Sequence, residues 1–228
     1  MNPKHPGAYA IALPRGGAES ALSSNRVIRN TYLLLSATLT FSALAAAISA
    51  ALNLPHPGIL LTLGGFFALL FAVHKLKSSG WGILAVFALT GFMGYTLGPI
   101  VNRYLGLPNG HEIVMQAMGA TAVIFIGLSA YALSSKKDFS FMGGFLMVGI
   151  LLAFLAGLAA IFFSIPALSL TVSAAFVLLM SGLILYETSN IIHGGETNYV
   201  LATVTLFVSL FNLFTSLLQL LGFLGGDD

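Results

Sequence analysis

Seven long apolar runs follow one another along the chain, each separated from the next by a short stretch that is polar or contains glycine or proline. A helix needs about 20 mainly apolar residues to cross a bilayer, and every run except the second reaches that length. The pattern therefore predicts seven transmembrane helices. Their expected ranges are 30–52, 58–73, 81–101, 112–133, 141–164, 166–190 and 199–223.

The segment before the first run differs from the rest of the chain. It is polar, contains proline and glycine, and has no apolar core of the kind that a signal peptide carries. We expect residues 1–29 to form a flexible cytosolic tail. No later loop is long enough to hold a soluble domain, so residues 30–228 are expected to form one seven-helix transmembrane domain.

The composition agrees with this pattern and excludes the other broad classes. Hydrophobic residues make up 57% of the 228 residues and charged residues 7%, whereas a soluble domain carries roughly 25% charged residues. The mean hydropathy of +0.96 is far too high for a disordered chain. The sequence therefore predicts an all-α integral membrane protein.

The basic residues predict the orientation of the helices, because cytosolic loops of membrane proteins carry an excess of Lys and Arg. Of the nine basic residues, four lie in the tail, two after the second run and two after the fourth, all on one side of the predicted membrane. Arg103 lies on the other side. The amino terminus is therefore expected in the cytosol and the carboxyl terminus outside. A net charge of +2 offers no basic stripe for nucleic acid.

A polar stripe marks one face of the last run. Its members recur at spacings of three and four, the period of a helix face: Thr205, Ser209, Asn212, Ser216 and Gln219. The stripe extends roughly 21 Å along a helix, and lipid offers its side chains no hydrogen-bond partner. We therefore expect the seventh helix to be central or to line a cavity. The stripe serves either for hydrogen bonding between helices or as part of a transport pathway.

Glu187 is the one acid predicted to lie inside a membrane-spanning run, among the apolar neighbours Leu183, Ile184 and Ile191. An acid at such a position is by default a functional candidate, because burial makes the protonation of carboxyl groups responsive to pH near neutrality. Glu187 is therefore the candidate pH sensor. Alternatively, it lies in the last helical turn and reaches cytosolic water, as the polar residues around it allow.

The loop after the sixth run, residues 193–198, is the one expected cytosolic loop without Lys or Arg. In it, His193 and Glu196 are spaced to pair or to bind a cation. No other fixed ligand accompanies them, so we expect no dedicated metal site. The loop is better explained as a helix stop followed by a capping segment.

The third run contains a small-residue spacing and a proline. Gly94 and Gly98 have the spacing that lets two membrane helices approach closely. Pro99 removes one helical hydrogen bond and leaves the carbonyl group of Tyr95 without its donor. Gly98 and Pro99 are therefore predicted to form a closely packed kink, which is a candidate position for gating.

No catalytic site is predicted. The absence of cysteine excludes disulfides, thiolate metal sites and cysteine nucleophiles, and no H-E-x-x-H zinc motif occurs. A retinal protein needs a lysine inside a helix, whereas all five lysines lie in the tail or the loops. We therefore expect neither an enzyme nor a resident cofactor.

Residues 185–214, LYETSNIIHGGETNYVLATVTLFVSLFNLF, resemble the signature hairpin of the Bax inhibitor-1 (transmembrane Bax inhibitor motif) family, and most closely its bacterial YccA-like branch. Three further segments agree with that branch: RNTYLLLSATLTFSA, GYTLGPI and KKDFSFMGG. The resemblance covers nearly the whole chain. It implies a seven-helix, multi-pass protein of the bacterial inner membrane with its last helix at the centre.

The same resemblance implies a role for two positions. Several family members are described as pH-sensitive calcium leak pathways gated by two acids, one in each of the last two helices. The first position falls on Glu187, a glutamate where aspartate is usual, and the second falls on Ser209. This implies a sensor reduced to a single acid. Simple hairpin geometry places Ser209 several ångströms deeper than Glu187, with Thr205 closer in level.

Two functions follow as hypotheses. The first is a weak, pH-modulated leak for calcium or another cation, with Glu187 as the sensor and Thr205, Ser209 and Asn212 as its polar neighbours. The second, which the YccA-like branch implies, is a non-catalytic modulator or substrate-like partner of an AAA-type membrane protease. In the second hypothesis the protease grips the tail of residues 1–29.

Overall fold

The apolar runs form helices throughout the part of the chain that the computed structural model describes. That part covers residues 16–225 for the backbone and 25–225 for the side chains. Within it, seven helices are long and apolar enough to cross a membrane, as predicted. They are α1 (Gly16–Ala51), α2 (Ile59–Leu76), α3 (Trp81–Leu105), α4 (Gly110–Ser135), α5 (Gly143–Phe162), α6 (Pro166–Ile192) and α7 (Tyr199–Leu224), with a short 3₁₀ helix, η1 (Ser140–Met142), before α5.

The start of α1 differs from the sequence prediction. The helix begins at Gly16, so residues 16–29 continue it where a tail was expected. The reason is that this stretch contains no proline, and its polar residues are tolerated in a helix outside the bilayer. The part of α1 that is apolar enough to span begins at Asn25. Residues 1–15 of the expected tail lie outside the described residues.

α2 also differs slightly, because it continues through His74 and Lys75 to Leu76. The predicted helix ends before these basic residues, at Val73. Cations near the carboxyl end of a helix interact favourably with the helix dipole, so they prolong the helix here instead of ending it. α2 is nevertheless the shortest of the seven spans, as predicted.

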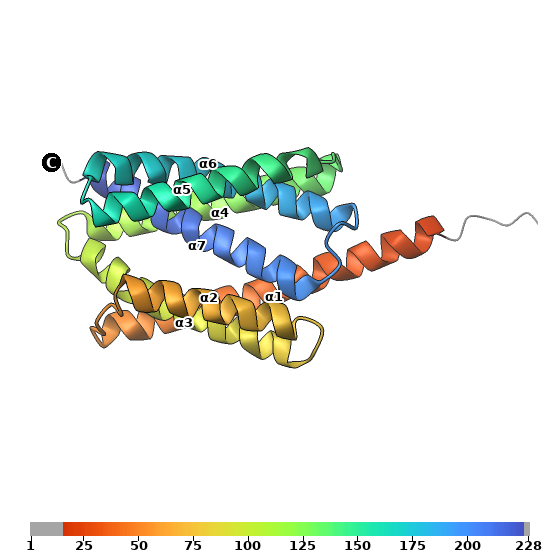
Figure 1. The fold of residues 1–228 in the computed structure, drawn as a ribbon, viewed down its shortest axis with the longest axis horizontal. Coiled ribbons are helices and arrows are strands. Elements are labelled where there is room, and N and C mark those ends of the chain that lie inside the picture. The colour runs from red at the N-terminus through yellow and green to blue at the C-terminus, as the bar shows by residue number, and fades with distance from the viewer. Residues whose placement is uncertain (1–15, 226–228) are drawn as a thin grey trace, which may run out of the picture.

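α7 lies at the centre of the bundle, which confirms the prediction drawn from its polar stripe. It packs against α1, α2, α3, α4 and α6. In Figure 1 it runs diagonally between one group of helices, α4, α5 and α6, and a second group, α1, α2 and α3. In its most apolar stretch, 56% of the residues are buried inside the protein, the largest share among the seven spans.

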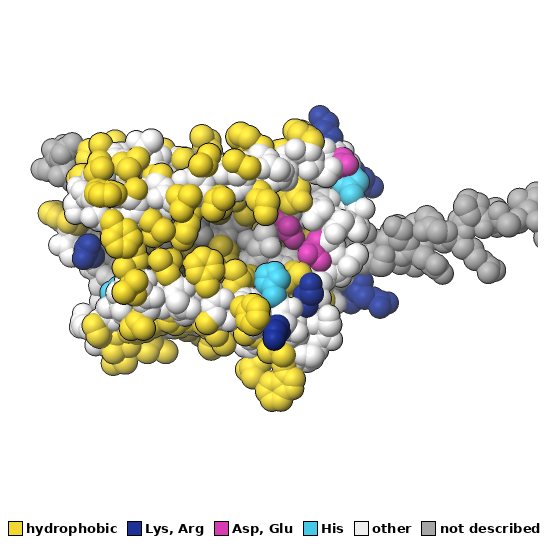
Figure 2. Space-filling model, viewed as in Figure 1, with side chains coloured by type: hydrophobic (Ala, Val, Ile, Leu, Met, Phe, Trp, Pro, Cys, Tyr) yellow, Lys and Arg dark blue, Asp and Glu magenta, His cyan; other side chains and the backbone are white. Residues whose placement is uncertain are grey.

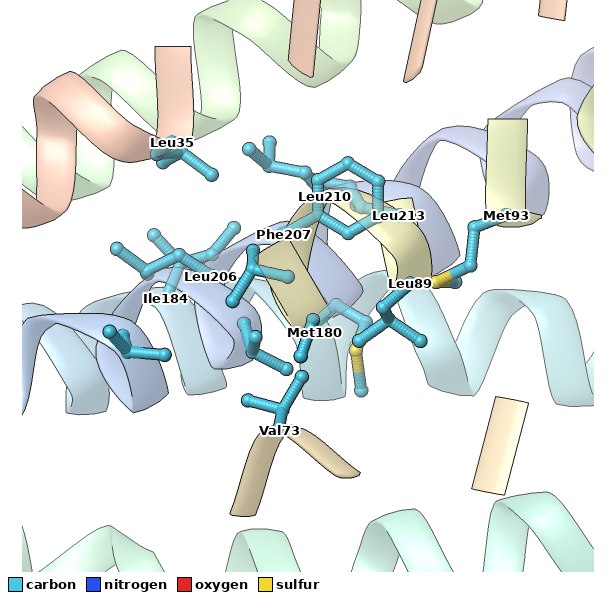
Figure 3. Packing of buried hydrophobic residues seen from close by; sticks show 14 residues of the cluster. Leu35, Val73, Leu89, Met93, Met180, Ile184, Leu206, Phe207, Leu210 and Leu213 are labelled. Atoms are coloured by element: carbon cyan, nitrogen blue, oxygen red, sulfur yellow. The ribbon is translucent and has the colours of Figure 1, made fainter. Parts of the chain in front are cut away.

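The core forms around the middle of α7. Figure 3 shows Phe207, Leu210 and Leu213 of α7 among side chains from four other helices. These neighbours are Leu35 of α1, Val73 of α2, Leu89 and Met93 of α3, and Met180 and Ile184 of α6. Lipid tails are as apolar as these side chains, so close packing, and not removal from water, holds the helices together.

The basic side chains gather mainly at one end of the bundle (Figure 2). We call it the basic end, defined by Arg29, Lys75, Lys77, Lys136 and Lys137. Hydrogen bonds join its loops, as when Asn198 binds the carbonyl oxygen of Lys77. The arrangement agrees with the charge distribution used above, and the cytosolic location of this end stays a prediction.

Candidate functional site

The polar stripe of α7 lies on the helix that the bundle encloses. Ser209 is fully buried, whereas Thr205 and Asn212 are half-buried. The Ser209 hydroxyl donates to the carbonyl oxygen of Thr205 at 2.8 Å, and Asn212 Nδ2 donates to that of Val208 at 2.8 Å. α7 therefore satisfies these polar groups from its own backbone, as burial in a membrane requires.

Gln219, at the far end of the stripe, joins α7 to α6. Its Nε2 donates to Ser169 Oγ at 2.6 Å, and its Oε1 accepts from Ser173 Oγ at 2.8 Å. Both halves of the amide group are thus bonded to the neighbouring helix. At this end, the stripe provides hydrogen bonding between helices, one of the two roles predicted for it.

Glu187 lies near the end of α6 and is only 5% exposed. Ile184 and Ile191, on the same side of the helix, are fully buried. The neighbouring Thr188 forms a hydrogen bond of 3.3 Å with the hydroxyl group of Tyr32 in α1. Protein therefore surrounds most of the Glu187 side chain, five residues before the end of α6.

Glu187 and Ser209 lie at different depths in the bundle. Thr188, next to Glu187, bonds to Tyr32, and Thr203 of α7 donates to the carbonyl oxygen of the residue before Tyr32 at 3.3 Å. Gln219 of α7 bonds to Ser169 and Ser173 of α6, and this antiparallel register sets Glu187 opposite Thr203. Ser209 follows Thr203 by six residues, which is roughly 9 Å along a helix. The structure does not bring the two positions implied by the family resemblance to one level.

The predicted pairing of His193 with Glu196 is replaced by other contacts. The ring nitrogens of His193 lie within hydrogen-bond distance of two carbonyl oxygens, that of Ser189 at 2.8 Å and that of Lys136 at 3.1 Å. Glu196 instead accepts a hydrogen bond from the backbone N–H of Asn198 at 2.6 Å. His193 thus holds the α4–α5 loop against α6, and Glu196 shapes the turn into α7.

The stop-and-cap interpretation of this loop is confirmed. Gly194 adopts a φ of 76°, a left-handed conformation that ends α6. The side chain of Asn198 then caps α7 by accepting from the N–H groups of Val200 and Leu201 at 3.0 and 3.2 Å. Its Nδ2 donates to the carbonyl oxygen of Lys77 at 3.0 Å. One side chain therefore starts α7 and ties it to the α2–α3 loop.

A second carboxylate stands near Glu187, which sequence reasoning missed. The backbone N–H of Glu196 donates to the carbonyl oxygen of Asn190, three residues after Glu187, at 3.3 Å. The three-residue spacing between His193 and Glu196 had suggested a pair, whereas the turn after α6 brings Glu196 back toward the end of that helix. A spacing in the sequence carries no information about such a reversal, so no signal for it was available.

An apolar cleft of about 990 Å³ lies between α2 and α5. Figure 2 shows the hollow between two ridges of hydrophobic side chains. Val208, Phe211 and Asn212 of α7 contribute to its lining. Phe67 of α2 and Phe154 of α5 also line it, and their rings meet edge to face with centroids 6.2 Å apart. Of the predicted site residues, Asn212 is the one that lines the cleft.

Gly98 and Pro99 lie where α3 packs against α1. Ser49 Oγ donates to the carbonyl oxygen of Tyr95 at 2.9 Å, the group that Pro99 leaves without a helical donor. A Cβ atom on Gly98 would lie 2.6 Å from Ser49 Cβ and 2.7 Å from the carbonyl oxygen of Ala46. The predicted close packing is confirmed, and a role in gating stays a prediction.

The described side chains offer little to a resident metal ion. Among residues 25–225, no group of three or more His, Cys, Asp or Glu is arranged to hold one. The side chains lining the cleft are apolar or uncharged, with Asn212, Tyr186 and a few hydroxyl groups as its polar members.

Comparison with known proteins identifies the family of this chain. The chain matches the family model described as "Inhibitor of apoptosis-promoting Bax1" over residues 24–226. It is 53% identical over 208 residues to the protein named Modulator of FtsH protease YccA in Escherichia coli K12, covering 91% of this chain and 94% of that protein. In a second Escherichia coli strain the protein is named Inner membrane protein YccA.

Two other relatives carry no functional name. An uncharacterised protein of Pseudomonas aeruginosa is 54% identical over 202 residues, covering 89% of this chain and 91% of that protein. An uncharacterised membrane protein of Vibrio cholerae is 42% identical over 211 residues, covering 92% and 95%. With seven spans, a central α7 and matches along almost its whole length, this chain belongs to the Bax inhibitor-1 family and to the bacterial YccA-like branch within it.

Proposed function

We propose that this protein is a non-catalytic modulator of a membrane-anchored AAA-type protease of the FtsH kind. One observation carries the proposal: 53% identity along 91% of this chain to a protein named as a modulator of FtsH protease. The similarity extends over 94% of that relative. A shared role therefore rests on the whole seven-helix fold and not on one shared segment.

The polar contacts inside the bundle support a structural role for the stripe. Ser209 and Asn212 bond to the α7 backbone, and Gln219 bonds to α6. Hydrogen bonds between two helices, such as those of Gln219, hold membrane helices in register. A rigid bundle is suited to present its outer surface, or its tail, to another membrane protein.

We further propose that the amino-terminal segment is the part the protease engages. α1 begins at Gly16, whereas its membrane-spanning part begins at Asn25. The segment up to residue 29 is polar and long enough to be gripped, and the charge distribution predicts that it lies in the cytosol. Its engagement would make this protein a competitor of other substrates.

Two deletions test this proposal in membranes that contain the protease. Removing residues 2–15 leaves α1 intact, and removing residues 2–25 also takes away the helical part before the span. We expect the full chain to co-purify with the protease and to slow the turnover of a second membrane substrate, and the longer deletion to abolish both effects. If both deletions behave as the parent, the tail is not the site of engagement. If the parent neither associates nor alters turnover, the proposed function fails.

The burial of Glu187 favours a second candidate function, a pH-modulated passage for calcium or another cation. Glu187 is 5% exposed, and the turn after α6 brings the backbone of Glu196 to Asn190, three residues after Glu187. A carboxyl group enclosed in a membrane protein marks ion pathways more often than ordinary packing. In this candidate function, Thr205 and Asn212 provide polar positions further along α7.

Calcium flux into liposomes across about pH 6 to 8 tests the second candidate. We expect Glu187→Gln to flatten the pH response of the flux. Glu112→Gln is the matched control, since Glu112 lies exposed at the start of α4 and bonds only to Gln116 among the described side chains. Identical flux and pH response in the parent and Glu187→Gln would remove Glu187 from the mechanism.

A further inference from the structure

The ring of His193 lies between two carbonyl groups that belong to different segments of the chain. Its Nδ1 is 2.8 Å from the carbonyl oxygen of Ser189 in α6, and its Nε2 is 3.1 Å from that of Lys136, the residue that follows α4. A carbonyl oxygen accepts hydrogen bonds and has no proton to donate. Each ring nitrogen therefore has to carry a proton to bond with the oxygen that it faces.

The hydroxyl group of Ser189 does not change this requirement. It lies 3.3 Å from Nδ1 of His193, but it donates its proton to the carbonyl oxygen of Lys137 at 3.0 Å. The N–H of Phe139 donates to the same hydroxyl at 3.0 Å. A neutral imidazole carries one N–H group and one lone pair, so it keeps one of its two carbonyl contacts, whereas the imidazolium form keeps both.

The surroundings of the ring favour a positive charge. His193 directly follows α6 and Lys136 directly follows α4, so the ring lies at the carboxyl ends of two helices, where the helix dipole favours a cation. Asp138 follows in the same loop as Lys136. Its hydrogen bonds to Ser140 lower its pKa most, and the charge of His193 adds to this lowering. Asp138 is therefore a carboxylate whose charge acts on the ring.

The other charged groups near the ring lie in the α4–α5 loop, in α6 and in the turn after it. Lys136 and Lys137 carry the same charge as the imidazolium, but both side chains are exposed, so water and salt screen them. Glu196 follows His193 by three residues and adds a negative charge. Glu187 lies roughly 9 Å further back along α6. His193 itself is exposed, so its ring exchanges protons with the water at the basic end.

We infer that His193 is a protonation-dependent latch between the end of α6 and the α4–α5 loop. With both ring nitrogens protonated, the ring ties Ser189 to Lys136 and holds the loop against α6. When the ring loses a proton, one of the two contacts is lost, and the contacts of the Ser189 hydroxyl, which do not titrate, remain. Histidine changes its charge between about pH 5 and 8. The latch is therefore closed on the acidic side of this range and open on the alkaline side.

Hydrogen exchange of the amides of residues 136–139, measured on the purified full chain at about pH 5.5 and 8, tests the latch. His193→Gln removes the titrating ring. Comparing this variant with the parent at the same pH cancels the intrinsic pH dependence of exchange. His74→Gln is the matched control, because His74 is also exposed next to the basic end. The ring of His74 lies 3.0 Å from the carbonyl oxygen of Leu70 in its own helix, and so joins no loop to another helix there.

We expect the loop of the parent to exchange about two- to fivefold more slowly than that of His193→Gln at the acidic pH, the gain expected for a cation at a helix end. At the alkaline pH, the two proteins should exchange at the same rate. His74→Gln should match the parent at both pH values. In nitrogen-15 NMR of the parent, the His193 ring should lose its second proton at the pH where the protection of the loop is lost.

Several outcomes would overturn the inference. Equal exchange in the parent and His193→Gln at both pH values excludes the latch, as does loop protection in the parent that does not follow the protonation of the His193 ring. The NMR titration uses the parent alone, so it tests the inference even if His193→Gln does not fold. The assay contains no protease and no calcium gradient, so its failure leaves both proposed functions untouched.

Discussion

Ser49 Oγ donates a hydrogen bond of 2.9 Å to the carbonyl oxygen of Tyr95, across the interface between α1 and α3. Pro99, four residues after Tyr95, has no N–H group to offer that carbonyl. Ser49 is 1% exposed, so neither water nor lipid can replace it as donor. A side chain of one helix thus completes the backbone bonding of another, at a point where Gly98 lets the two helices pack closely.

Ser49→Ala should destabilise the bundle by about 1 to 2 kcal/mol, because it leaves a buried carbonyl group without a donor. In a Pro99→Ala background, residue 99 regains its N–H group and the same substitution should cost close to nothing. The measurement is reversible unfolding of the four proteins of this cycle in mixed micelles. Additive effects of the two substitutions would show that Ser49 does not act through the Tyr95 carbonyl.

Gly98→Ala should destabilise the α1–α3 interface by about 1 to 3 kcal/mol, because the added methyl group overlaps atoms of Ser49 and Ala46. Gly119→Ala is the control, since a Cβ atom there meets no other atom within 4 Å. It should cost nothing, as alanine favours helices over glycine. Thermal unfolding in detergent distinguishes the two, and equal midpoints would mean that α1 and α3 are not held at this distance.

The helices were predictable because each is an apolar run with polar punctuation, which is the dominant constraint in a bilayer. The central place of α7 was predictable too, since its stripe, including Ser209 and Asn212, has no stable position facing lipid. The extension of α1 to Gly16 was not predictable, because polar residues show where a helix leaves the membrane and do not show where the helix itself ends. The cap formed by Asn198 was predictable, because the composition of residues 193–198 indicates a helix stop followed by a capping segment.

The cleft could not be predicted, since α2 and α5 are apolar on every side. Phe67 and Phe154 look in the sequence like other lipid-facing residues, and only the packing shows that they face each other. The depth of the two site positions, by contrast, was predictable. Residues equally far from a hairpin turn lie level with each other, so simple geometry already places Ser209 deeper than Glu187.

The loop between α4 and α5 should be sensitive to acid through Asp138. Its Oδ1 accepts from the N–H group of Ser140 at 2.8 Å, and this hydrogen bond lowers the pKa of Asp138 from its ordinary value. Because the pKa of Asp138 is lower in the folded state than in the unfolded state, its carboxylate stabilises the folded loop at pH values above the unfolded pKa. This stabilisation is lost as pH falls through the folded pKa, below about 4.

Limited proteolysis with an acid-active protease, at pH values on both sides of that range, measures this effect. The parent loop should become more susceptible to cleavage as the pH falls. In Asp138→Asn the amide oxygen can still accept from Ser140 and does not titrate there, so cleavage should depend less on pH. Asp138→Ala should be cleaved readily throughout. A parent and an Asp138→Asn variant with the same acid response would place the sensitivity elsewhere.

Asn198 combines two contacts that substitution can separate. Its oxygen caps α7 at Val200 and Leu201, and its Nδ2 donates to the carbonyl oxygen of Lys77. Asn198→Ala should lose both contacts and lower the free energy of unfolding by about 1 to 2 kcal/mol, whereas Asn198→Ser retains a capping oxygen and loses the tie to the α2–α3 loop.

Hydrogen exchange separates the two effects of Asn198. The amides of Val200 and Leu201 should exchange faster in Asn198→Ala than in Asn198→Ser, while the α2–α3 loop should loosen equally in both. Fast exchange at the start of α7 in both variants would mean that the tie to Lys77, and not the cap, holds the first turn of α7.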